Sequence, residues 1–278
     1  MREIPYSDYE NMFSKWLARL NESRAWRRPV SFQGMRFVPP TLDRWAALQA
    51  HRFGLMGTAE LRFFQRTIRR NWHIADVGAN QGLYTLYFSR HAVEGRVYAF
   101  EPDPRLFAAL KENIQRNRVE NVTLFNAAVS SQNAKLLLQP GRLNRGDNRI
   151  VQDAVGPGTI AVDAVMLDQA ITELGLDLLK VDVQGFEMEV LRGAERLMRA
   201  NPELVICLEF WPHGLRIAGS SPEELLDLLH GKGFSLFRLC NGVRCEPFTY
   251  RPMDWDRHTQ FCNLVATRSA IPRQSLQP

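Results

Sequence analysis

Cysteine is scarce in this chain of 278 residues, which has four and no Cys-x-x-Cys pair. Cys207 and Cys262 lie inside apolar, strand-like runs, and Cys240 and Cys245 have no histidine beside them. A disulfide framework or a zinc site would need a closer pattern of ligands. We therefore expect buried free thiols and no zinc site.

Long apolar runs are also missing. No run approaches the roughly 20 residues that a membrane-spanning helix needs, and Met1–Glu10 has no apolar signal-peptide core. The sequence has no internal repeat and no low-complexity tract. We therefore expect a soluble, cytoplasmic protein. We also expect one large α/β domain with an extension, because 278 residues are too few for two such enzymes.

Charge is unevenly distributed along the chain. Residues 1–73 contain 13 Lys and Arg against 6 Asp and Glu, a net charge of +7, whereas the whole chain carries +5. This basic, aromatic-rich segment could contact an anionic glycan, a lipid headgroup or nucleic acid. A structural cap is favoured instead, because Leu61, Phe64 and Ile68 fall on one helical face. We expect residues 1–70 to form a mainly helical extension.

The segment His73–Thr85 has the pattern of a buried strand, a glycine turn and a helix. Gly78 and Gly82 allow a tight turn and close approach of a ligand to the backbone. Ala79 and Asn80 replace the middle glycine of a dinucleotide fingerprint, and no Gly-Lys-Ser/Thr follows. The turn therefore disfavours NAD and FAD and excludes ATP bound by a P-loop.

A second strand ends on an acid, in the segment Arg96–Pro104. The carboxylate of Glu101 can accept hydrogen bonds from both hydroxyls of a ribose. Asp103 and Pro104 then supply an N-cap and the first residue of a helix. Asp76 and Glu101 would repel a phosphate, whereas S-adenosylmethionine carries a sulfonium and an ammonium. The charge pattern favours that cofactor.

A third strand and turn, within Leu176–Gly193, carries the sequence Lys-Val-Asp-Val-Gln-Gly. Together with Asp76–Asn80 and Phe100–Pro102, it resembles the FkbM family of S-adenosylmethionine-dependent methyltransferases, from about His73 to about Thr267. The resemblance implies a class I methyltransferase fold: an α/β protein with a seven-stranded, mostly parallel sheet between helices and a last antiparallel strand. We place this domain at residues 71–270, followed by a disordered tail at 271–278.

The resemblance also implies roles for individual residues. Glu101 would hold the ribose, and Asp182 would lie beside the sulfonium. Gln184 and Phe186 stand where many relatives have Glu and Ala, and these differences bear on the choice of acceptor. The methionine end of the cofactor would be shaped by Asp76, Gly78, Ala79, Asn80 and Gly82, and the adenine would be flanked by Asn126 and Ala127.

Apolar periodicity predicts the remaining elements. These are helices at Leu167–Leu174, Glu187–Arg199 and Pro222–Leu229, and strands at Lys135–Leu138, Thr159–Asp163, Leu204–Glu209, Phe234–Leu239 and Phe261–Ala266.

Methyl transfer to a hydroxyl requires a group that takes up the hydroxyl proton. The candidates are Asp182, and Glu209 with His213 after the neighbouring strand, because neighbouring ends of parallel strands open into one crevice. Asp182 and Glu209 could instead bind a divalent cation, but no further acid is identified, so a metal is not favoured. The simpler alternatives are a turn-capping role for Glu209 and a surface position for His213.

Members of the resembled family methylate hydroxyls, so the sequence predicts O-methylation of a small-molecule or glycan acceptor. The acceptor would be a sugar, a polysaccharide or a secondary metabolite, and an anionic or lipid-linked acceptor is included in this expectation. Base methylation of nucleic acid is disfavoured, because Asp182–Gly185 lacks the Asp/Asn-Pro-Pro-Tyr/Phe motif of amino-group methyltransferases that act on DNA. The alternatives are an NAD(P)-linked oxidoreductase and a cofactor-binding module without catalysis. The sequence does not fix the oligomeric state.

Overall fold

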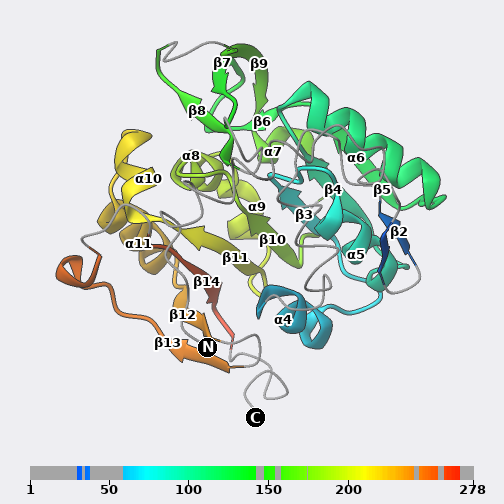
Figure 1. Cartoon of the computed structure of the whole chain (residues 1–278). Coiled ribbons are helices and arrows are strands. Elements are labelled where there is room, and N and C mark those ends of the chain that lie inside the picture. The colour runs from blue at the N-terminus through cyan, green and yellow to red at the C-terminus, as the bar shows by residue number, and fades with distance from the viewer. Residues whose placement is uncertain are drawn as a thin grey trace, which may run out of the picture.

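The computed structural model describes residues 30–32, 35–37, 59–141, 147–153, 158–173, 175–240, 244–255 and 260–269. Helices and strands alternate along most of this range (Figure 1). The elements in chain order are β1 (Val30–Phe32), β2 (Met35–Phe37), α4 (Ala59–Thr67), β3 (Ile74–Val77), α5 (Leu83–His91), β4 (Val97–Phe100), α6 (Pro104–Arg116), β5 (Val122–Phe125), β6 (Ala128–Val129), β7 (Ala134–Gln139), β8 (Arg149–Val151), β9 (Ile160–Val165), α7 (Leu167–Ala170), β10 (Leu178–Val181), α8 (Glu187–Arg192), α9 (Glu195–Ala200), β11 (Val205–Phe210), α10 (Pro212–Ile217), α11 (Pro222–Gly231), β12 (Ser235–Cys240), β13 (Arg244–Pro247), the 3-10 turn η5 (Pro252–Asp254) and β14 (Cys262–Thr267).

The central sheet has eight strands in the order β13-β12-β14-β11-β10-β3-β4-β5. Strands β5, β4, β3, β10 and β11 pair in parallel, and β14 runs antiparallel between β11 and β12. This is the expected α/β architecture with a last antiparallel strand. The expected count of seven strands is wrong by one, because the chain turns back after β12 and adds β13 as an antiparallel edge strand.

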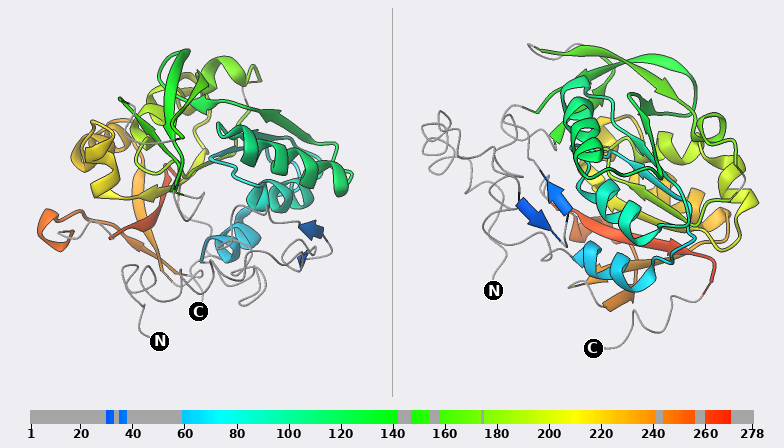
Figure 2. Two further views of the ribbon diagram at one scale, coloured as in Figure 1. Left: turned by 45° about the horizontal axis from the view of Figure 1, so that its top comes forward. Right: turned by 90° about the vertical axis from the view of Figure 1, so that its right-hand side faces the viewer.

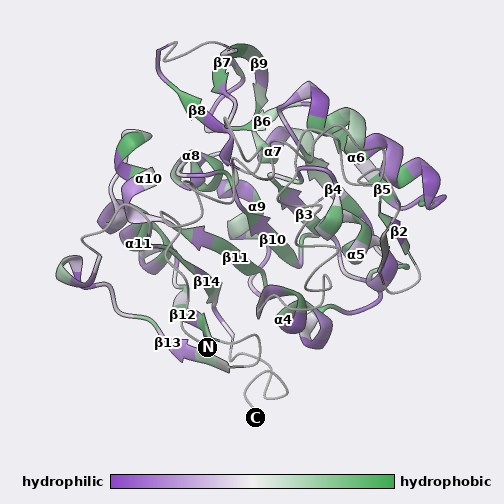
Figure 3. Ribbon diagram, viewed as in Figure 1, coloured by the Kyte–Doolittle hydropathy of each residue, from purple (hydrophilic) through white to green (hydrophobic). Residues whose placement is uncertain are grey.

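Side chains of the sheet alternate between two hydrophobic layers, as the two-residue period of a strand requires. On one face, Ile74 and Leu178 join a cluster with residues of α4, α5 and α6. On the other face, Ala75 and Leu179 join a cluster with residues of α7 to α11. The two helical layers cover the sheet on both sides (Figure 2), and the inner strands are largely apolar (Figure 3).

A smaller sheet of four strands, in the order β6-β9-β7-β8, lies beside the central one. The strands expected near Lys135–Leu138 and Thr159–Asp163 are β7 and β9, which pair antiparallel. Their apolar side chains form a separate small cluster around Leu138 and Val162. The sequence predicted these strands but not their grouping into a second sheet.

Two helices differ from the sequence prediction, one by a break and one by its length. The helix expected at Glu187–Arg199 is divided into α8 and α9 around Gly193. A Cβ atom at Gly193 would lie 2.1 Å from the carbonyl oxygen of Ser130, so the backbone makes a close contact at this break. Helix α7 ends at Ala170, short of the expected Leu174.

The N-terminal extension is described in two pieces. In α4, Leu61 and Phe64 are buried, and the ring of Phe64 contacts that of Phe88 with centroids 4.9 Å apart. This confirms packing of the predicted helical face at its first two positions. Strands β1 and β2 form an antiparallel pair within this extension, which the sequence predicts to be mainly helical. Residues 1–29 and 38–58, like the tail 271–278, lie outside the described residues.

The four cysteines are free thiols, and Cys207, Cys245 and Cys262 are buried. The expectation for these three is confirmed. Among the described residues, no helix is both long and apolar enough to cross a membrane.

Candidate active site

The order of the strands defines where a ligand crevice can form. The chain runs outward from β3 to β4 and β5, and then returns to form β10 on the other side of β3. Crevices in such sheets open at this switch point, at the carboxyl ends of the strands. Four acids lie at or directly after these carboxyl ends: Asp76 on β3, Glu101 after β4, Asp182 after β10 and Glu209 on β11.

The glycine turn after β3 is held tightly against its neighbours. The backbone amides of Gly78 and Ala79 both donate to the carbonyl oxygen of Phe100, at 3.0 and 2.9 Å. Gly78 has a positive φ of 79°, and a Cβ atom there would lie 1.9 Å from the carbonyl oxygen of Asp182. Because the turn after β3 and the segment after β10 lie in direct contact, only glycine fits this position.

Glu101 is buried and connects the turn after β3 with the turn after β4. Its two carboxylate oxygens accept hydrogen bonds of 2.8 Å from the backbone amides of Asn80 and Asp103. Burial raises the pKa of Glu101 to about 8, in spite of these two bonds. In the ionised form, each oxygen has a second lone pair that can accept from a further donor.

A buried lysine that the sequence reasoning missed joins the first and third turns. The amine of Lys180 lies 3.4 Å from Asp76 Oδ1 and 3.9 Å from Asp182 Oδ2, and its side chain is 2% exposed. Asp76 also accepts a 2.7 Å hydrogen bond from the Thr85 hydroxyl. Burial lowers the pKa of Lys180, but the nearby carboxylates outweigh burial and the net shift is upward.

The same lysine is linked to the N-terminal extension. Its amine lies over the ring of Tyr84, 4.8 Å from the centroid, and the Tyr84 hydroxyl donates a 2.7 Å hydrogen bond to Glu60 on α4. Burial raises the pKa of Glu60, and the charge of Lys180 opposes this rise. Helix α4 therefore supplies a carboxylate to the charged cluster beneath the crevice.

Asp182 and Glu209, expected to face one acceptor, are joined by a single side chain. The amide nitrogen of Gln184 donates to Asp182 Oδ1 at 3.0 Å and to Glu209 Oε2 at 2.8 Å. The side chain of Asp182 is 41% exposed. Burial and the charge of Asp182 raise the pKa of Glu209 well above its usual value.

Glu187 is a third acid near this pair. Its Oε1 accepts hydrogen bonds from the backbone amides of Val183 and Gly185, at 3.3 and 3.1 Å. Burial raises the pKa of Glu187 to about 7. Its Oε2 accepts no hydrogen bond within the described part of the chain.

The remaining expected site residues lie around this centre. His213 is exposed in the first turn of α10, with its ring centroid 5.8 Å from that of Trp211. Asn126 is exposed after β5, and its amide donates to the carbonyl oxygens of Glu101 and Pro102. Ala127 is buried beside it. Of the three candidate catalytic residues, Asp182 and Glu209 are therefore connected through Gln184. His213 is exposed, which fits the alternative that it is a surface histidine.

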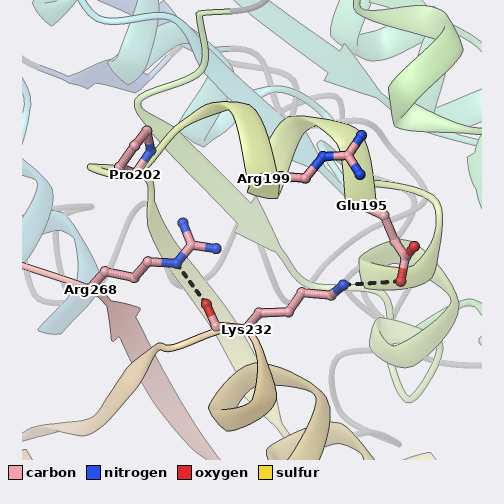
Figure 4. A pocket seen from close by; sticks show the side chains of 5 residues that line it. All are labelled: Glu195, Arg199, Pro202, Lys232 and Arg268. Carbon is pink, nitrogen blue, oxygen red and sulfur yellow. Dashed lines mark hydrogen bonds and ion pairs between the residues drawn. The ribbon is translucent and has the colours of Figure 1, made fainter.

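No group of three or more His, Cys, Asp or Glu side chains within the described ranges is arranged to hold a metal ion. A cavity of about 440 Å³ lies elsewhere, lined by Glu195, Arg199, Pro202, Lys232 and Arg268 (Figure 4). These residues precede β11 and β12 or follow the antiparallel β14, at the opposite edge of the sheet. Arg199 lies in the last turn of α9 and Lys232 is the C-cap of α11, where the helix dipole favours cations. This cavity is separate from the acidic crevice.

Sequence reasoning missed Lys180, Glu60 and Glu187. For Lys180 a signal was present, since a lysine in an apolar parallel strand is buried on either face. Glu60 carried no comparable signal, because its partner Tyr84 lies 24 residues away on another helix.

The chain is similar in sequence to known methyltransferases. Residues 76–236 match the model of the methyltransferase FkbM domain. Methyltransferase sdnD of Sordaria araneosa is 30% identical over 204 residues, which are 60% of this chain and 75% of that protein. The 2-O-methyltransferase NoeI of Sinorhizobium fredii (strain NBRC 101917 / NGR234) is 29% identical over 45% of this chain and 58% of its own length. The 31-O-demethyl-FK506 methyltransferase FkbM of Streptomyces tacrolimicus is 31% identical over 59% of this chain and 72% of its own.

Proposed function

Since the chain belongs to the FkbM family of methyltransferases, we propose that it transfers the methyl group of S-adenosylmethionine to a hydroxyl of a sugar, polysaccharide or secondary-metabolite acceptor. Family membership makes it an S-adenosylmethionine-dependent methyltransferase and argues against an NAD(P)-linked oxidoreductase. The hydroxyl acceptor and the residue roles below are the proposal. The observation that carries it is the joined pair of carboxylates at the switch point of the sheet.

The residues at these strand ends fit this cofactor in charge and in hydrogen-bonding capacity. Asp76, Asp182 and Glu60 surround one lysine, so the cluster keeps an excess of negative charge for a cationic ligand. In the glycine turn, Gln81 Oε1 is buried and accepts no hydrogen bond from the described residues, which leaves one acceptor unused. When bound, S-adenosylmethionine would supply an electrophilic methyl group on a positively charged sulfur.

The cofactor-binding roles follow from these positions. Glu101 accepts from the ribose hydroxyls with its second lone pairs, while its backbone bonds hold the turn. Asp182 faces the sulfonium and Asp76 fixes Lys180 below it. The turn of Gly78, Ala79, Asn80 and Gly82 lines the methionine end, and Asn126 with Ala127 borders the adenine.

Proton removal from the acceptor falls to the carboxylate pair. A general base binds a proton more readily when its pKa is raised, and burial together with the charge of Asp182 moves the pKa of Glu209 upward. Glu209 therefore accepts the hydroxyl proton, with Asp182 orienting the acceptor. His213 remains a second candidate base, reached by an acceptor that extends over α10.

The names of two relatives support a hydroxyl acceptor. NoeI is a 2-O-methyltransferase, and the FkbM protein is a 31-O-demethyl-FK506 methyltransferase. Both names specify transfer to oxygen. We extend that chemistry to this chain, with a small molecule or a glycan as acceptor. An anionic or lipid-linked acceptor remains part of the proposal through the basic segment 1–73, most of which lies outside the described residues.

Two experiments test the proposal. Isothermal titration should show binding of S-adenosylhomocysteine and none of NADH. Methyl-labelled S-adenosylmethionine should then label alcohol acceptors in a panel of sugar glycosides, polysaccharides and polyketide alcohols, with Asp182→Asn as the inactive control. Labelling of amine or thiol analogues in preference to alcohols would count against O-methylation. Cofactor binding without labelling of any acceptor class would favour a non-catalytic module.

A further inference from the structure

The turn after β10 holds Gln184 in an unusual backbone conformation. Its φ is 56°, in the left-handed region, which residues other than glycine adopt at a cost in free energy. Such a cost persists where the surrounding structure enforces it, and often where a side chain has a function. The conformation places Gln184 between Asp182, which follows β10, and Glu209 on the neighbouring strand β11.

The surroundings of the turn fix this conformation from two sides. Glu187 accepts hydrogen bonds from the backbone amides of Val183 and Gly185, the two residues that flank Gln184. A Cβ atom at Gly185 would lie 2.4 Å from the carbonyl oxygen of Gly214, so the turn is in direct contact with α10. The backbone therefore has little freedom to move Gln184 away from the acids.

The side chain of Gln184 meets an electrostatic need. Asp182 and Glu209 extend from β10 and β11, which pair in parallel with Val181 opposite Leu208. Two carboxylates held close together repel each other when both are ionised. The amide of Gln184 directs one hydrogen to each, at 3.0 and 2.8 Å. A divalent cation between two carboxylates would offset the same repulsion, since hard cations prefer oxygen ligands.

We infer that Gln184 is a positioning residue whose amide occupies the place of a bridging divalent cation between Asp182 and Glu209. The inference rests on the proposed function for the role of the acid pair in acceptor binding. Its structural content is independent of that role: the Gln184 amide nitrogen contacts both carboxylates, and a carboxylate in its place would bring three acids together. Exchange of the amide for a carboxylate should therefore create a cation site.

The test replaces Gln184 by glutamate, which has the same shape and supplies a third carboxylate. Binding of Mn²⁺ is followed by the loss of its free-ion electron paramagnetic resonance signal, so no acceptor is needed. The Gln184→Glu variant should bind Mn²⁺ at least tenfold more tightly than the wild type. Gln169→Glu is the matched control, because Gln169 is exposed on α7 and the substitution adds the same charge away from the site.

Two further variants keep the test decisive. Gln184→Ala removes the amide hydrogens and opens room for hydrated Mn²⁺, so its affinity should fall between those of the wild type and Gln184→Glu. Adding Glu209→Gln to Gln184→Glu should abolish the gain. The inference is overturned if the wild type binds Mn²⁺ as tightly as Gln184→Glu, or if neither Gln184 variant exceeds the Gln169→Glu control. Titration of the wild type with S-adenosylhomocysteine reports separately on the proposed function.

Discussion

Replacement of Glu101 by glutamine tests how the glycine turn and the ribose site depend on one carboxylate. Both oxygens of Glu101 accept a 2.8 Å hydrogen bond from a backbone amide, one from Asn80 and one from Asp103. A glutamine has one carbonyl oxygen, and its amide nitrogen cannot accept. One of the two backbone amides therefore loses its partner in the Glu101→Gln variant.

The expected effect follows from the burial of this carboxylate, whose residue is 4% exposed. Leaving one buried donor unpaired costs about 1–3 kcal/mol, and loss of the carboxylate weakens the bonds to the ribose by a similar amount. A change of about 1–3 kcal/mol corresponds to about a 5–150-fold loss of affinity. The fold should persist, because the apolar clusters on both faces of the sheet are unchanged.

The pH dependence of binding gives a sharper signature. Burial raises the pKa of Glu101 to about 8, so the carboxyl is mainly protonated at pH 6 and mainly ionised at pH 9. The ionised form accepts from ribose hydroxyls better than the protonated form. Wild-type affinity for a ribose ligand should therefore rise as the pH passes through 8. Glu101→Gln should show a flat profile, because the glutamine does not titrate.

The assay is isothermal titration with S-adenosylhomocysteine at pH 9, and with 5′-methylthioadenosine from pH 6 to pH 9. The second ligand keeps the adenosine and lacks the amino acid, so its own charge does not change over this range. Glu112→Gln is the matched control. Glu112 is exposed on α6, and its ion pair in the described part of the chain is with Arg116, one turn along the same helix. Equal affinities of Glu101→Gln and the wild type at pH 9 would refute the ribose role.

Three further predictions concern the charged residues of the crevice. Asp182→Asn should keep the fold and lose most turnover on an identified acceptor, and Glu209→Gln should lose less. EDTA should leave wild-type turnover unchanged. If EDTA abolishes turnover and Mg²⁺ restores it, a metal ion and not a general base activates the acceptor. Lys180→Met should lower the free energy of unfolding in urea by about 3–5 kcal/mol, since it leaves Asp76 buried without its cation; an unchanged midpoint would show that the lysine is not needed. Burial raises the pKa of Glu187 in the folded protein to about 7, above its value in the unfolded chain, so the folded state binds more protons. The wild type should therefore lose stability as the pH rises toward and through 7. Glu187→Gln should lose less stability over this range, because the glutamine does not titrate. Unfolding curves of both proteins at pH 5 and pH 8 measure the difference.

Local chemistry explains what the sequence could predict. The turn after β3 was predictable because the positive φ of Gly78 and its contact with Asp182 demand glycine. The location of Glu101 followed from a strand that ends on an acid, and its neighbourhood followed from the parallel order of strands. The identity of the fold class needed the three motifs together, since each motif alone occurs in many nucleotide-binding folds.

Contacts between distant segments explain what the sequence did not reveal. Glu60 is linked to Lys180 through Tyr84 and by charge attraction, across three separate elements. The break between α8 and α9 depends on the contact of Gly193 with the carbonyl oxygen of Ser130, 63 positions earlier in the chain. Periodicity describes one element at a time, so it predicted a continuous helix there. Bridging of the two acids by Gln184 likewise depends on the pairing of β10 with β11.

The excess of acids around Lys180 has a measurable consequence for cofactor binding. Burial raises the pKa values of Glu60, Glu187 and Glu209, and the charge of Asp182 contributes to each rise. A cationic ligand beside Asp182 would offset that repulsion, so it should lower these pKa values and release protons. S-adenosylmethionine should release protons in this way, whereas S-adenosylhomocysteine lacks the sulfonium charge and should release fewer protons. Calorimetric titrations at pH 7.5 in buffers of different ionisation enthalpy measure the number of protons released. Equal release by the two ligands would show that the sulfonium does not lie near these carboxylates.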